Sequence, residues 1–100
     1  MHNLEALEFF LIGDFSQGVD YEDLNNVIST LKETNVHESL IAVLNSIIKH
    51  GDYEKIALFI KEHGERTMRP HKAELFVKFL YARLTNTPTE MTPWILQRIE

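Results

Sequence analysis

The chain contains no cysteine, only four glycines and three prolines, and no run of lysines and arginines. Without cysteine there is no disulfide framework and no thiolate site, which fits a reducing cytosol. The scarcity of glycine and proline in a chain that is 44% hydrophobic favours a compact helical domain over a disordered one. Because the net charge is −5 and the cations are not clustered, we expect no sequence-independent binding of nucleic acid.

Long apolar segments are also missing. The longest apolar runs are residues 40–44 and 56–60, far shorter than the roughly 20 residues that span a bilayer. The N-terminus has neither the cationic nor the small-residue part of a signal peptide. One hundred residues suit a single domain, and no linker-like segment divides it. We therefore expect one domain over residues 1–100, in the cytoplasm and without membrane insertion.

Apolar residues recur with helical spacing along the whole chain. No segment alternates with the period of two that half-buried strands require, and no Asn-Gly-type hairpin turn occurs. The predicted helices are residues 4–12, 21–33, 36–50, 53–63, 70–85 and 93–99. The residues predicted to cap their N-termini are Asn3, Asp20, Asn35, Asp52 and Thr92. The predicted helix stops are Gly13, Gly51 and Gly64. The sequence therefore predicts an all-α fold.

A pentapeptide of the form Asp-Tyr-Glu-x-Leu/Ile occurs twice, at residues 20–24 and 52–56. Each copy comes just after a glycine and opens a helical apolar pattern. The turns that would separate pairs of helices lie at Gln17, Gly51 and Thr85, a spacing of roughly 34 residues both times. This period resembles a degenerate tetratricopeptide repeat. The pattern predicts three stacked helical hairpins, an architecture that builds surfaces for binding other proteins.

A closer resemblance covers most of the chain. Its quoted segments are Leu-Ile-Gly at 11–13, Glu-Ser-Leu at 38–40, Ser-Ile-Ile-Lys-His-Gly-Asp-Tyr at 46–53 and Leu-Tyr-Ala-Arg-Leu at 80–84. In order and spacing they are similar to the larger subunit of the needle-protein chaperone of bacterial type III secretion systems, the YscG/SctG-type family. The chain departs from that family in its last connection, residues 86–89, and in its short C-terminus.

The resemblance implies a cytoplasmic bacterial chaperone connected with virulence. In that family a small tetratricopeptide-like protein forms a heterodimer with a short helical-hairpin co-chaperone. Together they bind the C-terminal amphipathic helix of the needle subunit in a concave groove. This prevents the needle subunit from polymerising before export. The expected partners are therefore a helical co-chaperone and a needle subunit.

Two of the predicted helices carry a second apolar stripe, whereas a helix in a monomer needs only one buried stripe. Counting back from the turns gives the positions that face the groove of a tetratricopeptide-like hairpin. The predicted groove residues are Leu7, Leu11, Ile41, Asn45, Ile48, Leu75, Phe79 and Ala82. The alternative is that both stripes are core, as in the middle helices of a bundle.

The first predicted helix is apolar on nearly every face, which is more apolar surface than two neighbouring helices can cover. Leu4, Phe9 and Phe10 are therefore predicted to bind the co-chaperone. The alternative is that Phe9 or Phe10 packs in the monomer core. Trp94 is predicted to cap the last hairpin rather than to anchor an interface.

Residues that carry catalysis or bind metals do not form a recognisable pattern. The five histidines include no pair at i, i+4 spacing with carboxylates, and no Gly-rich phosphate loop is present. We expect no catalytic residue, no cofactor and no metal. Two other non-enzymatic functions compete with the chaperone. One is an acidic immunity or anti-toxin protein that covers a basic partner, and the other is a repeat protein that binds an unrelated peptide.

Overall fold

The computed structural model describes residues 4–34 and 37–99, and it contains helices without any strand in these residues. The elements are α1 (Glu5–Phe9), η1 (Phe10–Asp14), η2 (Tyr21–Asp23), α2 (Leu24–Thr34), α3 (Glu38–His50), α4 (Tyr53–Gly64), α5 (Pro70–Leu84) and α6 (Pro93–Arg98). η1 is a π-helix and η2 is a 3₁₀ turn. The all-α prediction is confirmed. The predicted caps Asn3 and Asn35 lie outside the described residues.

Most helix ends follow the local sequence. Gly51 ends α3 with a left-handed backbone at φ 71°, which favours glycine. The side chains of Asp52 and Thr92 accept hydrogen bonds from first-turn N–H groups, at 3.3 and 3.2 Å. Asp20 differs: it precedes the 3₁₀ turn, and its side chain makes no capping hydrogen bond. The two copies of the pentapeptide are therefore not equivalent.

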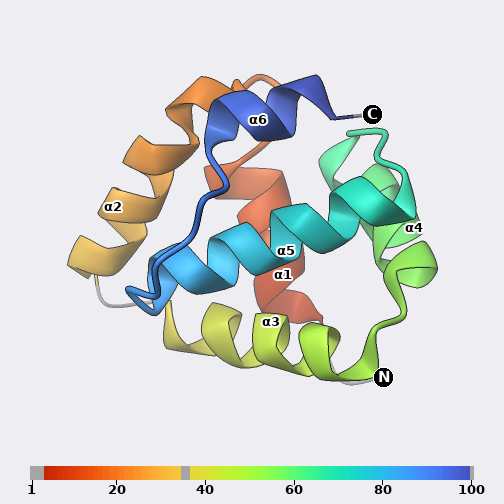
Figure 1. The fold of residues 1–100 in the computed structure, drawn as a ribbon, viewed down its shortest axis with the longest axis horizontal. Helices are drawn as coiled ribbons and strands as arrows, with labels where there is room; N and C mark the ends of the chain where they lie inside the picture. The colour runs from red at the N-terminus through yellow and green to blue at the C-terminus, as the bar shows by residue number, and fades with distance from the viewer. Residues whose placement is uncertain (1–3, 35–36, 100) are drawn as a thin grey trace.

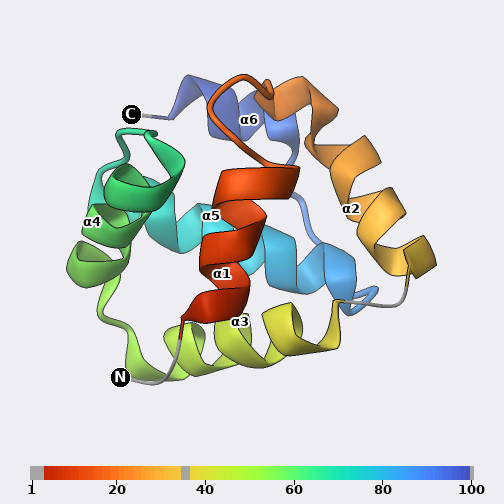
Figure 2. The ribbon, with the colours of Figure 1, turned by 180° about the vertical axis from the view of Figure 1, so that it is seen from behind.

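Four helices form a frame, and two further helices cross its two faces (Figures 1 and 2). α2, α3, α4 and α6 make the four sides, α5 runs across one face, and α1 runs across the other. α5 packs against α3, α4, α2 and α6, and α1 with η1 packs against α3 and α4. α3 and α4 are consecutive, yet they meet at a corner instead of lying side by side. The predicted stack of three hairpins is not confirmed, because the helices pack mainly on α5 and α1.

η1 determines how the N-terminal segment meets the core. The N–H of Phe15 donates to the carbonyl of Phe10 (2.7 Å), the five-residue spacing of a π-helix. This spacing keeps both rings buried, with centroids 6.0 Å apart, and Phe15 stacks on Phe76 of α5 at 5.7 Å. α4 approaches η1 closely because residue 64 is glycine: a Cβ there would lie 3.2 Å from Cδ2 of Leu11. The N-terminal helical segment thus continues past Gly13, the stop that the sequence predicts.

None of the helices in the described residues has the length and apolar character that a membrane crossing needs.

Candidate protein-binding surface

The outer side of α1 and η1 carries two large exposed apolar side chains. Phe9 is 60% exposed and Ile12 is 54% exposed. They are three residues apart, so they project from the same side of the helical segment. Leu7 and Leu11, on the opposite side, are fully buried. Figure 2 shows α1 across the face of the molecule with no other helix in front of it. We call this pair the Phe9–Ile12 ridge.

A groove runs beside the ridge, between α1 and α3. It consists of two adjoining pockets of ≈ 440 and ≈ 310 Å³, which share Ala6, Phe9 and Ser39 in their walls. The first pocket continues along α3 to Val43. The second continues past His37 to the end of α2. We call this depression the α1–α3 groove. Phe9 lines both parts of it and so is placed to contact anything that binds there.

On its other side the ridge borders α4. A hollow of ≈ 410 Å³ lies between η1 and the end of α4, with Ile12 and His63 in its wall. Nε2 of His63 lies 3.2 Å from Oε1 of Glu8, and the ring nitrogen Nδ1 lies 3.1 Å from the carbonyl oxygen of Phe59. The His63 ring also stacks on the Phe59 ring, with centroids 4.1 Å apart. The His63–Glu8 contact joins α4 to α1 below the ridge, and the two contacts with Phe59 orient the His63 ring.

The charged side chains on the segment that carries the ridge have one sign. Glu5, Glu8 and Asp14 come from α1 and η1, and residues 4–19 contain no lysine, arginine or histidine. Glu38, at the start of α3, is exposed on a neighbouring element. The apolar ridge is thus bordered by carboxylates. Such a border attracts a basic partner, and it disfavours a second copy of the same face through like-charge repulsion.

The three residues predicted to bind a co-chaperone differ in exposure. Phe9 is exposed and lines the α1–α3 groove. Leu4 is half-buried and packs against the core. Phe10 is 1% exposed and packs in the core, as the alternative expects, although it also lines the second pocket of the groove. The π-helix explains this, because it keeps Phe10 on the buried side together with Phe15. Ile12 was missed, although its spacing of three residues from Phe9 was visible in the sequence.

Half of the predicted groove residues belong to the monomer core. Leu7 and Leu11 are 0% exposed, Phe79 is 1% exposed and Ala82 is 9% exposed. Leu7 and Phe79 are therefore core residues, as the alternative expects, whereas Leu11 also lines the hollow beside η1 and Ala82 lines a hollow between α2 and the end of α5. Phe79 and Ala82 are buried because α5 has neighbours on several sides. Leu7 and Leu11 are buried because α1 and η1 pack against α3 and α4.

The other predicted groove residues belong to α3 and α5 and are partly exposed. Ile41, Asn45 and Ile48 of α3 and Leu75 of α5 are each half-buried. The three apolar members pack against the edge of the core. None of the four lines the hollows beside α1. The structure therefore places the open apolar surface on α1, and not on the second stripes of α3 and α5.

Apolar side chains are also exposed away from α1. Leu58 of α4 is 63% exposed, and Trp94 and Ile95 of α6 are 53% and 43% exposed. Trp94 was predicted to cover the last hairpin, but Leu96 is the fully buried residue of α6. Within residues 4–34 and 37–99, no group of three or more histidines and acidic residues is placed to hold a metal ion.

Comparison of the chain with models of protein families, with curated proteins and with solved structures gives no significant match. The resemblance to the needle-protein chaperones therefore stays a prediction, and the surface around α1 has to be interpreted from its own geometry.

Proposed function

We propose that this chain is a non-enzymatic protein-binding module whose α1 face binds an amphipathic helix of a partner protein. The observation that carries the proposal is the joint exposure of Phe9 and Ile12 beside the α1–α3 groove. Fully burying a side chain of this size contributes about 1.5–3 kcal/mol. An amphipathic helix laid in a groove buries such side chains with its own i, i+3 and i+4 apolar positions.

The carboxylate border defines the chemistry of the partner. Basic side chains flanking the apolar stripe of the partner helix would lie near Glu5, Glu8 and Asp14. Complementary charge of this kind speeds association and sets orientation more than it adds affinity. The partner that fits best is therefore a helix with an apolar stripe and lysines or arginines beside it.

The resemblance to the YscG/SctG-type family gives the proposal its most specific form. In that form the chain is a cytoplasmic type III secretion chaperone, α1 binds the helical-hairpin co-chaperone, and the pair keeps the needle subunit soluble. A second candidate, the acidic immunity or anti-toxin protein, is favoured by the carboxylates around the same face. The two candidates differ in whether the apolar ridge or the charge provides the affinity.

The test uses the small proteins encoded by the adjacent reading frames as ligands, with binding measured by calorimetry. We expect Phe9→Asp to weaken binding of a helical-hairpin product by about tenfold or more, since one apolar anchor is lost and a charge is added. Leu58→Asp is the matched control, because Leu58 is equally exposed but lies on α4, away from the groove. Circular dichroism checks that both variants remain folded.

Two results would contradict the proposal. One is full affinity in the Phe9→Asp variant together with a loss in Leu58→Asp, which would move the interface to α4. The other is binding that disappears when salt is raised from about 0.05 to 0.5 M but is unaffected by Phe9→Asp. Because salt screens exposed charges, that result would favour the acidic inhibitor.

A further inference from the structure

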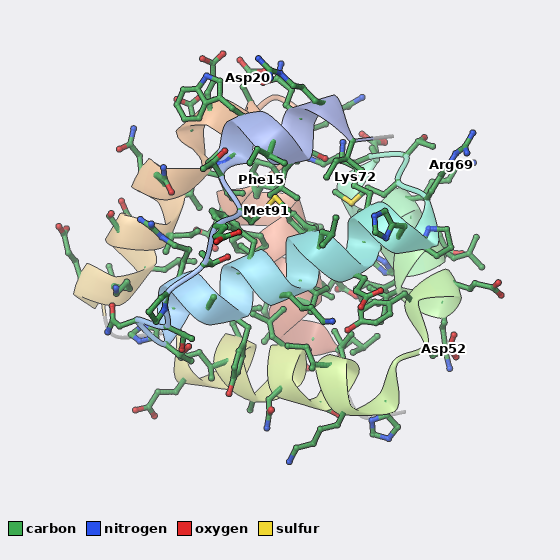
Figure 3. The ribbon with its side chains drawn as sticks, viewed as in Figure 1. Phe15, Asp20, Asp52, Arg69, Lys72 and Met91 are labelled. Carbon is green, nitrogen blue, oxygen red and sulfur yellow. The ribbon has the colours of Figure 1, made fainter. Side chains whose placement is uncertain are left out.

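Lys72 is a buried cation without a counter-ion. It lies in the first turn of α5, close to Phe15 in the view of Figure 3, and is only 7% exposed. Its Nζ lies 4.6 Å from the ring centroid of Tyr21. In the described part of the chain no carboxylate forms an ion pair with it. Buried lysines are normally paired, and the face of an aromatic ring compensates the charge only in part.

A second cation lies near the same phenol ring. The guanidinium carbon of Arg66 is 5.3 Å from the ring centroid of Tyr21. Its Nη2 donates hydrogen bonds to the carbonyls of Ser16 (2.7 Å) and Val19, while its Nε is buried without a partner. Arg66 also has no ion pair with a carboxylate among the described residues. Two positive charges thus lie within 5.3 Å of the centre of one phenol ring.

Burial is the main influence on the titration of these groups, and the charge of Arg66 is the second. Burial, and then the charge of Arg66, lower the pKa of the Lys72 ammonium. Burial raises the pKa of the Tyr21 phenol, and the charge and hydrogen bonding of Arg66 oppose that rise. Asp20 acts on Arg66 only through a longer-range attraction. An anion between the two cations would remove their mutual repulsion.

We propose that Arg66, Lys72 and Tyr21 form a binding site for a phosphate or sulfate group. Tyr21 and Arg66 are half-buried, so the cluster reaches the surface. Because Nη2 of Arg66 is engaged and Nε is buried, the guanidinium cannot offer a two-pronged contact to a carboxylate. A tetrahedral oxyanion instead accepts single bonds from separate directions. Its negative charge is also favoured by the N-terminus of α5.

Thermal unfolding in different anions tests this site. Inorganic phosphate and sulfate, compared with chloride and acetate at equal ionic strength, should raise the melting temperature of the native chain. Lys72→Met keeps the apolar stem but removes the charge, and we expect its dissociation constant for phosphate to be about tenfold higher or more. Lys78→Met is the control on the same helix, because Lys78 is exposed and bound to Glu74 (2.6 Å).

Stability without the anion gives a second readout. In chloride, Lys72→Met should be at least as stable as the native chain, since it removes an unpaired buried charge. Tyr21→Phe removes only the hydroxyl and should weaken phosphate binding several-fold without unfolding the protein. Equal stabilisation by chloride, acetate and phosphate would overturn the proposal. So would an unchanged phosphate affinity in Lys72→Met, or a large loss of its stability in chloride.

Discussion

The guanidinium of Arg66 lies 3.8 Å from the ring centroid of Phe15 and donates hydrogen bonds to the carbonyls of Ser16 and Val19. Through this one side chain, the connection between α4 and α5 holds the segment between η1 and η2 against the core. The segment needs such a partner because a loop carbonyl that loses water must find another donor.

Replacement of this arginine by lysine tests its structural role. Arg66→Lys keeps the charge, but an ammonium cannot lie flat on Phe15 and also donate to both carbonyls. We expect the free energy of unfolding to fall by about 1–3 kcal/mol in urea titrations. Arg69→Lys is the control, because Arg69 is exposed and makes no side-chain capping bond. Equal stability of the two variants would show that the Arg66 contacts contribute nothing.

Phe79 distinguishes core from groove. Phe79 is a buried residue of α5, so Phe79→Ala should lower the free energy of unfolding by about 3–5 kcal/mol, because the substitution leaves a cavity. Leu58→Ala removes an exposed apolar side chain and should change stability by less than about 0.5 kcal/mol. Chemical denaturation measures both. A Phe79→Ala protein of native stability would instead restore the predicted groove role.

The two aspartates of the repeated pentapeptide should behave differently. Asp52→Ala removes a side chain that accepts a first-turn N–H and should cost about 0.5–2 kcal/mol. Asp20 makes no capping hydrogen bond, so Asp20→Ala should cost clearly less. Parallel thermal melts of the two variants give the comparison. A larger loss for Asp20→Ala would contradict the difference seen between the two helix starts.

The free energy of unfolding should change with pH in the alkaline range, because Lys72 and Tyr21 titrate differently in the folded and unfolded chains. The pKa of Lys72 is lowered by burial, so below its ordinary value near 10.5 the unfolded chain binds more protons than the folded chain. Stability contributed by this lysine therefore rises with pH up to about 10. The pKa of Tyr21 is raised by burial above its ordinary value of 10.0, so higher pH ionises the unfolded chain first and stability falls.

The Lys72→Met variant isolates the first of these effects. The free energy of unfolding of the native chain and of the variant is measured with urea in chloride between about pH 8 and 10. As the pH rises, the native chain should gain stability relative to the variant. Lys78 and Tyr53, whose pKa values are also raised, are present in both proteins and cancel. Parallel pH curves for the two proteins would mean that Lys72 titrates alike in the folded and unfolded states.

The helices were predictable because their signals are local. Pro70 marks the start of α5, and Gly51 and Asp52 mark where α3 ends and α4 begins. The exceptions also have local causes: η1 continues past Gly13 as a π-helix, and Asp20 precedes a 3₁₀ turn. The candidate surface was predicted only in part. Phe9 was identified, whereas neighbouring Phe10 was not distinguished from it.

By itself, the sequence determined the helical class and most helix boundaries within a few residues. These follow from backbone hydrogen bonding, capping and composition, which act over a few residues. Only the tertiary structure decided that α3 and α4 meet at a corner, that α5 has neighbours on several sides and that no other helix covers the outer side of α1. The physical reason is that an apolar stripe in the sequence shows which side of a helix will be buried, but it does not show which distant helix will cover that side.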